Sequence, residues 1–525
     1  MSRTLILGPP GTGKTTAILS LVKDLLDVGY TADEIALVSY SRAATGELRD
    51  RLRKTTGIRE WPHVRTLHSM ATQLTGTRHF MADKHWSEFA SVCRFDLSPK
   101  RRAVTNIDDL PDATPDDALC AVNDYARSAL VDLETARGRT GLPVPPERLA
   151  RFARLLREYK DAAGVADFTD VLERAVGDGS LMGCRVLFVD EAQDLSPLQI
   201  AFIEAQLPHV DHAIVAGDDD QAVYAFQAAS PEWIGALARS PDWETRVLGQ
   251  SWRCPEAVRA AAVRVIARCA DRVPKAYAAR PEVGIYAHCP TLDEAVQVAS
   301  RAPSAFVLAR SHTGCTTAAR TLLAAGIPYV AERGRGPNPF GQPSLLAAIA
   351  TLHEYATTGS APTQSFATAI DTHAQMQHKG GVVKHGGKTA IAAHSRPRIN
   401  DGDLRAMDQD ALADALAGDF WRVLQAKVHG DSLRYLRHLY ESTGGKLPTP
   451  TVTVTTWHAS KGREADCVVI PDHLPWPCFD AICKGGAAGD SEHRAAYVAI
   501  TRARQQVLVV PSAGKYAYPF PRSQQ

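Results

Sequence analysis

The sequence predicts an α/β protein built on parallel sheets, and three observations point to this class. Apolar runs of strand length, such as 4–7, 186–189 and 213–216, are each followed by a polar loop. A glycine-rich loop separates the first run from a segment with helical spacing. The composition, 45% hydrophobic and 22% charged residues, is that of a globular protein. A chain of 525 residues is too long for one core, so several domains are expected.

The bulk properties narrow the setting. The net charge is +1, so a surface for nucleic acid has to be a local patch. Neither a signal peptide nor an apolar run of membrane-spanning length is evident, and the composition is rich in Ala and Arg. We therefore expect a cytoplasmic protein of a bacterial or phage-infected cell, without membrane association. None of the ten cysteines forms a CxxC pair, which predicts reduced, mostly buried thiols.

The segment "GPPGTGKT" at 8–15 fits the phosphate-loop pattern G-x-x-x-x-G-K-[ST] and lies between a strand and a helix. Its backbone N–H groups are expected to hold phosphates, with Lys14 reaching the β- and γ-phosphates and Thr15 binding Mg²⁺. The strand–loop–helix context argues against a chance glycine loop. The predicted nucleotide-binding residues are Gly8, Pro9, Pro10, Gly11, Thr12, Gly13, Lys14, Thr15 and Thr16. This motif alone does not separate a kinase, a GTPase, a transporter ATPase or a motor.

Two carboxylates follow the apolar run 186–189, at the sheet edge where ligands of open α/β sheets bind. We predict that Asp190 holds Mg²⁺ and that Glu191 orients and deprotonates the attacking water. The run 213–216 repeats this arrangement and is followed by three aspartates and Gln221. Gln221 is predicted to sense the γ-phosphate. Tyr224 and Phe226 follow, and their rings suit either stacking on bases or ordinary core packing.

In this order, the segments resemble the superfamily 1A DNA helicases of the UvrD/Rep/PcrA type. The resemblance covers residues 4–510 and is weak near 75–165 and 340–450. The matching segments are 8–15 (motif I), 37–52 (Ia), 65–71 (Ib), 167–170, 190–194 (II), 217–226 (III), 248–258 (IV), 455–466 (V) and 492–504 (VI).

The resemblance implies two RecA-like P-loop motor domains, each interrupted by a mostly helical insertion, with ATP between them and single-stranded DNA across them. The implied domains are 1–70 with 166–244 (first motor domain, 1A), 71–165 (1B-like insertion), 245–340 with 448–525 (second motor domain, 2A) and 341–447 (2B-like insertion).

The resemblance also implies roles for single residues. Arg253 and Arg502 match arginines that reach the γ-phosphate from the second motor domain, Trp252 takes the place of a base-stacking tyrosine, and Glu464 matches an acid near the nucleotide. For the DNA-path positions that follow, core or interdomain packing is the alternative. The positions that match the single-stranded DNA path are Tyr40, Thr66, His68, Tyr224, Phe226, Thr456 and His458.

The sequence departs from the family in four places. Only seven residues precede Gly8, and none is the glutamine that reads adenine in the family. Trp252 stands at the position of the stacking tyrosine, and stacking on an indole face does not discriminate between bases. We therefore expect relaxed nucleotide specificity. Phe226 and Gln227 stand where tryptophan and arginine are usual, and Arg463 replaces a leucine in motif V.

The segment 378–389, "HKGGVVKHGGKT", suits a hairpin that approaches duplex phosphates or, alternatively, a mobile surface loop.

The sequence thus predicts an ATP- and Mg²⁺-dependent translocase on single-stranded DNA, an ATP hydrolase and 3′–5′ helicase that acts at junctions of single- and double-stranded DNA. One alternative is a DNA-stimulated ATPase that remodels protein–DNA complexes or serves recombination without processive unwinding. A P-loop ATPase without nucleic acid is the other, and it leaves motifs Ia, Ib, III and V without a role. The pathway (repair, replication or recombination), any protein partner and the oligomeric state cannot be read from the sequence.

Overall fold

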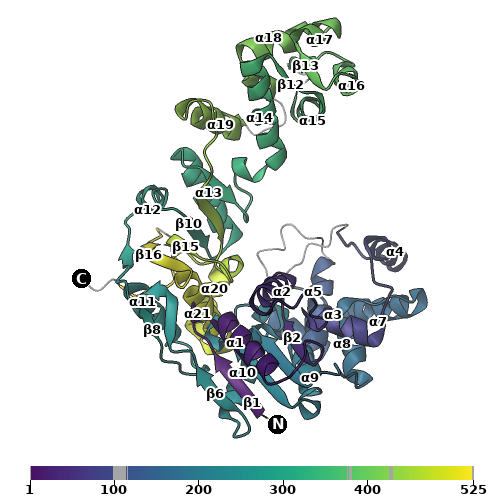
Figure 1. Cartoon of the computed structure of the whole chain (residues 1–525), viewed down its shortest axis with the longest axis vertical. Helices are drawn as coiled ribbons and strands as arrows, with labels where there is room; N and C mark the ends of the chain where they lie inside the picture. The colour runs from purple at the N-terminus through teal and green to yellow at the C-terminus, as the bar shows by residue number, and fades with distance from the viewer. Residues whose placement is uncertain are drawn as a thin grey trace. The chain divides into compact units, whose positions relative to one another are not determined.

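The computed structural model describes residues 2–98, 114, 116–374, 376–377, 381–424, 430–512 and 514–522. The chain divides into two compact units, which are described separately (Figure 1). Unit 1 comprises Met1–Ile285 and Pro477–Arg504. Unit 2 comprises Tyr286–Trp476 and Gln505–Gln525.

Unit 1 contains a six-stranded sheet of order β3-β2-β4-β5-β1-β6, in which all neighbouring pairs are parallel. Its strands are β1 (Ser2–Leu7), β2 (Ile35–Ser39), β3 (Val64–Thr66), β4 (Val186–Asp190), β5 (His212–Gly217) and β6 (Glu244–Val247). Leu7 pairs with Gly217 and Ser39 pairs with Asp190. The loops that follow β1, β2, β4 and β5 therefore leave the sheet at one edge.

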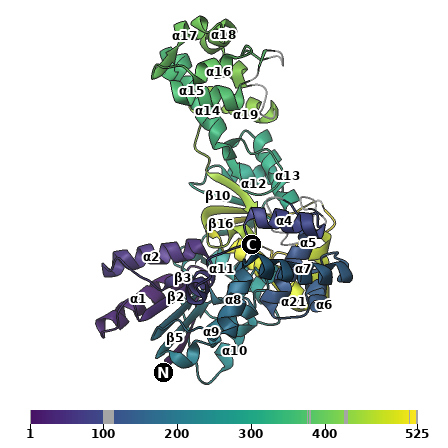
Figure 2. The same cartoon turned by 90° about the vertical axis from the view of Figure 1, so that its right-hand side faces the viewer.

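Both faces of this sheet are buried, because successive side chains of a strand point to opposite faces. Leu5 and Leu7 join the core cluster on one face, whereas Ile6 joins the cluster on the other. Helices α1 (Lys14–Asp27) and α2 (Arg42–Thr56) lie side by side over the Ile6 face (Figure 2). The helices that pack on the other face are α3 (Leu67–Thr75), α8 (Phe168–Gly177), α9 (Pro197–Glu204) and α10 (Glu232–Arg239).

The first insertion has its own core, built around Phe89, Phe95 and Phe152. Its described helices are α4 (Asp83–Cys93), α5 (Asp117–Ala129), α6 (Leu133–Thr140) and α7 (Pro146–Ala163). A nearly buried ion network joins this core to α8: Arg127 on α5 and Lys160 on α7 both bind the carboxylates of Asp167 and Asp170. The segment 108–117, whose Pro- and Asp-rich composition predicts a loop, falls largely outside the described residues.

The rest of unit 1 comes from two distant segments. These are β7 (Gln250–Pro255), α11 (Glu256–Ile266), β8 (Ala278–Arg280) and, after the second insertion, α21 (Gly486–Ile500). β7 pairs with β8 in parallel, and α21 packs against α11. The helix α20 (Trp476–Lys484) begins at the last residue of unit 2's long segment. The sequence places these segments in the second motor domain, and that boundary stays a prediction.

Unit 2 contains a second six-stranded sheet, of order β11-β14-β10-β15-β16-β9. The neighbours from β11 to β15 are parallel. Its strands are β9 (Ile285–His288), β10 (Ala305–Ala309), β11 (Tyr329–Ala331), β14 (Val452–Thr456), β15 (Ala465–Pro471) and β16 (Ala503–Val510), with helices α12 (Leu292–Ala299) and α13 (His312–Ala324) between the early strands. Two parallel six-stranded sheets confirm the predicted α/β class and fit two RecA-like domains.

The second insertion is mostly helical, as predicted, and shares one core cluster with the sheet of unit 2. Its elements are η6 (Pro339–Gly341), α14 (Pro343–Thr358), β12 (Ser360–Pro362), α15 (Thr363–His373), α16 (Gly387–Ala392), β13 (Arg398–Asn400), α17 (Asp401–Ala406), α18 (Asp410–Gly418), η8 (Phe420–Leu424) and α19 (Gly430–Ser442). The helical pattern at 410–428 continues only to Gly418, beyond which 420–424 tighten into a 3₁₀ turn. Tyr435 donates a hydrogen bond to the Ile327 carbonyl and so ties α19 to the loop before β11.

The segment 378–389 lies partly outside the described residues. Lys384 pairs with Asp408 at 2.6 Å, and Lys388 donates to the carbonyl of Asp371 at 2.5 Å. Both lysines therefore make contacts within the insertion itself. Among the residues that the structure describes, no helix is both long and apolar enough to cross a bilayer.

Candidate nucleotide site

The phosphate loop joins β1 to α1 as its motif predicts. Gly11 and Gly13 have φ values of +71° and +83°, a left-handed region that favours glycine. Lys14 folds back over the loop, and its Nζ donates to the Gly8 carbonyl at 2.9 Å. The first turn of α1 has no acidic residue, so the positive end of the helix faces the loop unopposed by a carboxylate of its own. This combination of backbone N–H groups and a lysine suits a phosphate chain.

The start of β7 lies directly against this loop. Ser251 Oγ donates to the Pro10 carbonyl at 2.8 Å, and the backbone N–H of Trp252 donates to the Gly11 carbonyl at 2.8 Å. A Cβ on Gly11 would come within 2.4 Å of Arg253 Cβ, so only glycine permits this approach. The Trp252 side chain is 69% exposed, which leaves its ring open to stack on a nucleotide base.

Asp190 ends β4 and Glu191 follows it, at the same edge of the sheet. Burial and, next, the charge of Glu191 raise the pKa of Asp190 to about 7, although Lys14 opposes the shift. Glu191 has a φ of +55°, an uncommon value for a residue with a side chain. Such backbone strain is typical of functional positions.

One line of hydrogen bonds connects the predicted catalytic groups. Gln193 donates from Nε2 to the Glu191 carboxylate and accepts the backbone N–H of Asp218 at 2.9 Å. Asp218 Oδ2 accepts from Gln221 Nε2 at 2.7 Å, and Gln221 Oε1 accepts from Arg502 Nη2 at 3.1 Å. The carboxylate predicted to activate water, the γ-phosphate sensor and one arginine are thus brought together.

The two predicted arginines lie beside one another. Arg253 Nη1 donates to the Thr501 carbonyl at 3.5 Å, and the neighbouring Arg502 is 1% exposed. Burial lowers the pKa of Arg502 to about 9, and repulsion by Arg253 contributes. Two cations this close attract an anion, because a negative charge between them relieves both the repulsion and the cost of burial.

The aromatic residues after Gln221 form a small group with Tyr40. The rings of Tyr40 and Tyr224 stack with centroids 5.8 Å apart, and Phe226 meets Tyr224 edge-on at 5.9 Å. Gln227, which replaces the family's arginine, accepts a hydrogen bond from the Tyr40 hydroxyl. The rings thus pack against one another, as the packing alternative expects, while Tyr224 and Phe226 remain partly exposed to solvent.

The other predicted DNA contacts of unit 1 lie at the start of α3. Thr66 caps this helix, since its hydroxyl accepts the Ser69 N–H at 3.3 Å. His68 is half-buried and meets the ring of Phe168 edge-on at 6.0 Å. Burial lowers the pKa of His68, although Asp167 opposes the shift, so the ring is neutral at physiological pH.

Three predicted site residues lie in unit 2. Thr456 ends β14 and accepts the Ala459 N–H at 3.2 Å, His458 is half-buried, and Glu464 is exposed. Arg463, the unusual residue of motif V, pairs with Glu332 at 2.6 Å within the same unit.

The donor set suits the groups that the motifs imply. Thr15, in the first turn of α1, offers a hydroxyl. Asp190, at the end of β4, offers a carboxylate. These are the hard oxygen ligands that Mg²⁺ prefers. The raised pKa of Asp190 also fits a cation site, because a cation beside this carboxyl would favour its ionised form.

Sequence reasoning missed several residues of the site. Ser251 and Gln193 lie in the matched segments 248–258 and 190–194, but no role was predicted for either, and the structure shows that Ser251 bonds the phosphate loop and that Gln193 links Glu191 to Asp218. Lys275 and Arg272 bind the aspartates before Gln221 from more than fifty residues away.

Residues 1–242 match the UvrD/REP helicase N-terminal domain. The ATP-dependent DNA helicase UvrD2 of Mycobacterium tuberculosis H37Rv is 29% identical over 302 residues, 51% of this chain and 42% of the relative. DNA helicase II of Escherichia coli K12 is 25% identical over 358 residues, 62% of this chain and 49% of the relative.

A third relative is the ATP-dependent DNA helicase Rep of Salmonella typhimurium, 24% identical over 286 residues, 50% of this chain and 41% of the relative. The matched part thus spans less than half the length of each of these three relatives.

Proposed function

We propose that this chain is an ATP-driven translocase on single-stranded DNA and a 3′–5′ DNA helicase. It is a distant homologue of UvrD, Rep and DNA helicase II, and its residues 1–242 match the UvrD/REP helicase N-terminal domain. The observation that carries the proposal is the line of hydrogen bonds from Glu191 to Arg502 beside the phosphate loop. A plain nucleotide-binding protein has no need to couple these groups.

The residues of unit 1 divide the work of hydrolysis. Lys14 and the loop amides bind the phosphate chain, and Glu191 accepts a proton from the attacking water. Arg253 and Arg502 stabilise the negative charge that grows on the γ-phosphate in the transition state. A Mg²⁺ ion held by Thr15 and Asp190 supplies further charge neutralisation when bound.

Coupling to DNA runs through the segment that carries Gln221. This residue touches the arginine side of the site, and Tyr224 follows three positions later with its ring stacked on Tyr40. A base that displaces or extends this stack shifts the same short segment, which changes the position of Gln221. Phe226 offers a second ring for the next base.

The translocation cycle rests on the predicted domains, 1–70 with 166–244 and 245–340 with 448–525. In the proposed cycle, ATP draws the two motor domains together and hydrolysis releases them. Thr456 and His458 supply DNA contacts from the second domain, and Glu464 contacts the nucleotide. Alternating grip on the strand then gives directional movement.

The test of this function uses DNA duplexes with a single-stranded tail at either the 3′ or the 5′ end. We expect ATP-dependent strand separation of the 3′-tailed duplex, none without Mg²⁺, and none with Lys14→Ala. The main alternative, a DNA-stimulated ATPase that remodels protein–DNA complexes, gives DNA-stimulated hydrolysis without strand separation. Unwinding of only the 5′-tailed duplex would contradict the proposed polarity.

A further inference from the structure

Three consecutive aspartates follow β5 and precede the γ-phosphate sensor. Asp218, Asp219 and Asp220 are 0%, 2% and 1% exposed, and the 3₁₀ turn Asp219–Gln221 holds them close together. Three buried carboxylates in one turn repel each other, and removal from water is costly for each of them. The turn keeps this conformation only if cations compensate the charge.

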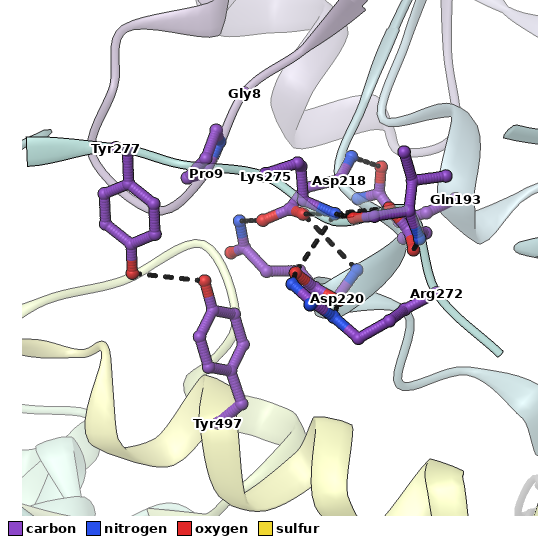
Figure 3. Close-up of polar contacts among 12 residues, drawn as sticks. Gly8, Pro9, Gln193, Asp218, Asp220, Arg272, Lys275, Tyr277 and Tyr497 are labelled. Carbon is purple, nitrogen blue, oxygen red and sulfur yellow. Dashed lines mark hydrogen bonds and ion pairs between the residues drawn. The ribbon is translucent and has the colours of Figure 1, made fainter. Parts of the chain in front are cut away.

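Two cations from one distant loop provide that charge (Figure 3). The ammonium of Lys275 lies 3.2 Å from Asp218, 2.5 Å from Asp219 and 3.0 Å from Asp220, and its side chain is 1% exposed. Arg272 grips Asp220 with two parallel hydrogen bonds of 2.8 and 2.6 Å. Burial lowers the pKa of Lys275, but the three carboxylates outweigh it and raise the pKa overall.

This loop is fixed at its other end to α21. The carboxylate of Asp490 accepts the backbone N–H groups of Ala270 and Asp271 at 3.1 Å each, and Arg494 donates to the Asp271 carbonyl. The helix α21 ends at Ile500, two residues before Arg502. The loop therefore connects the turn that carries Gln221 to the helix that ends two residues before Arg502.

We infer that Lys275, assisted by Arg272, is a positioning residue for ATP hydrolysis that holds Gln221 and Arg502 in register. The inference rests on the proposed function, because it assigns these two side chains to the γ-phosphate. Lys275 acts through Asp218, whose Oδ2 accepts from Gln221 Nε2 at 2.7 Å while Gln221 Oε1 accepts from Arg502. Without the ammonium, the carboxylates repel, Asp218 moves, and Gln221 loses the bond that orients it.

The test compares Lys275→Met with Lys160→Met in the full-length chain. Lys160 is a matched control, since it is also a buried lysine bound to two aspartates, but those lie at the N-terminus of α8 and bind the insertion instead of the turn before Gln221. We expect Lys275→Met to lower kcat for ATP hydrolysis by about tenfold to 100-fold with little change in KM. We expect Lys160→Met to keep the DNA-free kcat of the wild type.

A double-mutant cycle shows whether Lys275 acts through the sensor. If it does, adding Lys275→Met to Gln221→Ala lowers kcat no further than Gln221→Ala alone. If the kcat of the double variant falls by the product of the two single-variant losses, the inference is overturned. A Lys275→Met protein that unfolds at lower temperature yet keeps its kcat would also overturn it.

Hydrogen exchange gives a readout that needs no ATPase activity. The N–H groups of Gln221 and Ala222 donate to the carbonyls of Asp218 and Asp219 at 2.8 and 3.3 Å. We expect them to exchange faster in Lys275→Met and unchanged in Lys160→Met. Faster exchange in a chain that hydrolyses no ATP would contradict the proposed function but leave the positioning contact standing; unchanged exchange would overturn the contact itself.

A second variant covers the case in which Lys275→Met does not fold. Lys275→Met combined with Asp219→Asn removes one charge of each sign, and asparagine still accepts the Val273 N–H that Asp219 holds at 2.8 Å. Asp218 still loses its ammonium in this variant, so the same loss of kcat is expected. Recovery of the wild-type kcat would mean that only the net charge of the turn matters.

Discussion

Arg502 donates from Nη2 to Gln221 Oε1 at 3.1 Å, and the side chain of Arg502 is buried beside Arg253. The contact joins residues 281 positions apart in the chain. It places a guanidinium fork, which lysine cannot reproduce, against the predicted γ-phosphate sensor.

Arg502→Lys is therefore expected to lower kcat strongly although it keeps the positive charge. An arginine that stabilises phosphoryl transfer contributes several orders of magnitude, so we expect a fall of about 100-fold or more. Steady-state ATP hydrolysis measures it. Arg154→Lys on the exposed face of α7 is the control, and an equal loss in both variants would contradict a specific role for Arg502.

Glu191→Gln is expected to separate nucleotide binding from hydrolysis. Glutamine keeps the shape and the contact with Gln193 but cannot take a proton from water, so we expect kcat to fall by about 100-fold to 10,000-fold. Binding of ATP, followed by fluorescence of a labelled analogue, is expected to persist. A variant that hydrolyses ATP at the wild-type rate would assign the base to another residue.

The exposed ring of Trp252 leads to a prediction on nucleotide choice. Stacking on an indole face does not distinguish one base from another, so we expect ATP, dATP and GTP to be hydrolysed with similar kcat/KM. Trp252→Ala is expected to raise KM for all three and leave kcat nearly unchanged. Strict preference for ATP in the wild type would show that other groups read the base.

The ion network of Asp167 predicts a loss of stability in acid. Burial raises the pKa of Asp167, but Arg127 and Lys160 outweigh it and lower the pKa from 3.8 to about 2. A carboxyl whose pKa is depressed by folding stabilises the fold above its unfolded pKa, and this contribution disappears as the pH falls toward the folded value. We therefore expect about 2 kcal/mol of unfolding free energy to be lost between about pH 4 and pH 2.

Urea unfolding at a series of pH values measures this loss. Asp167→Asn keeps the cap of α8, because asparagine also caps helices, but it has no carboxyl to titrate. Its unfolding free energy is expected to fall less steeply in acid than that of the wild type. The same pH dependence in Asp167→Asn and in the exposed-site variant Asp161→Asn would contradict the assignment.

The strands and the phosphate loop could be predicted because local sequence determines them. An apolar run such as 186–189 is buried on both faces of a parallel sheet, and the glycines of 8–15 follow a pattern with a known backbone. The short pair β12 and β13 has three residues in each strand, too few to show an alternation. Apolar residues continue at helical spacing through 410–428, but the α-helix ends at Gly418 and residues 420–424 form a 3₁₀ turn.

The contacts of the candidate site depend on tertiary structure and were harder to foresee. The motifs around them singled out Arg253 and Arg502, and the structure places Arg253 against the phosphate loop and Arg502 against Gln221. Lys275 stands in a loop without periodicity, and its three partners lie more than fifty residues away. Gln227 matched no family residue, and only the structure shows that it accepts the Tyr40 hydroxyl.

The most direct test of the central claim is steady-state ATP hydrolysis with and without single-stranded DNA, with Lys14→Ala as the blank. The coupling of Gln221 to the rings of Tyr224 and Phe226 predicts that DNA raises kcat strongly and that the lysine variant loses the activity under both conditions. Active hydrolysis that does not respond to single-stranded DNA would contradict a DNA motor, because it would mean that the nucleotide site and these aromatic residues are not coupled.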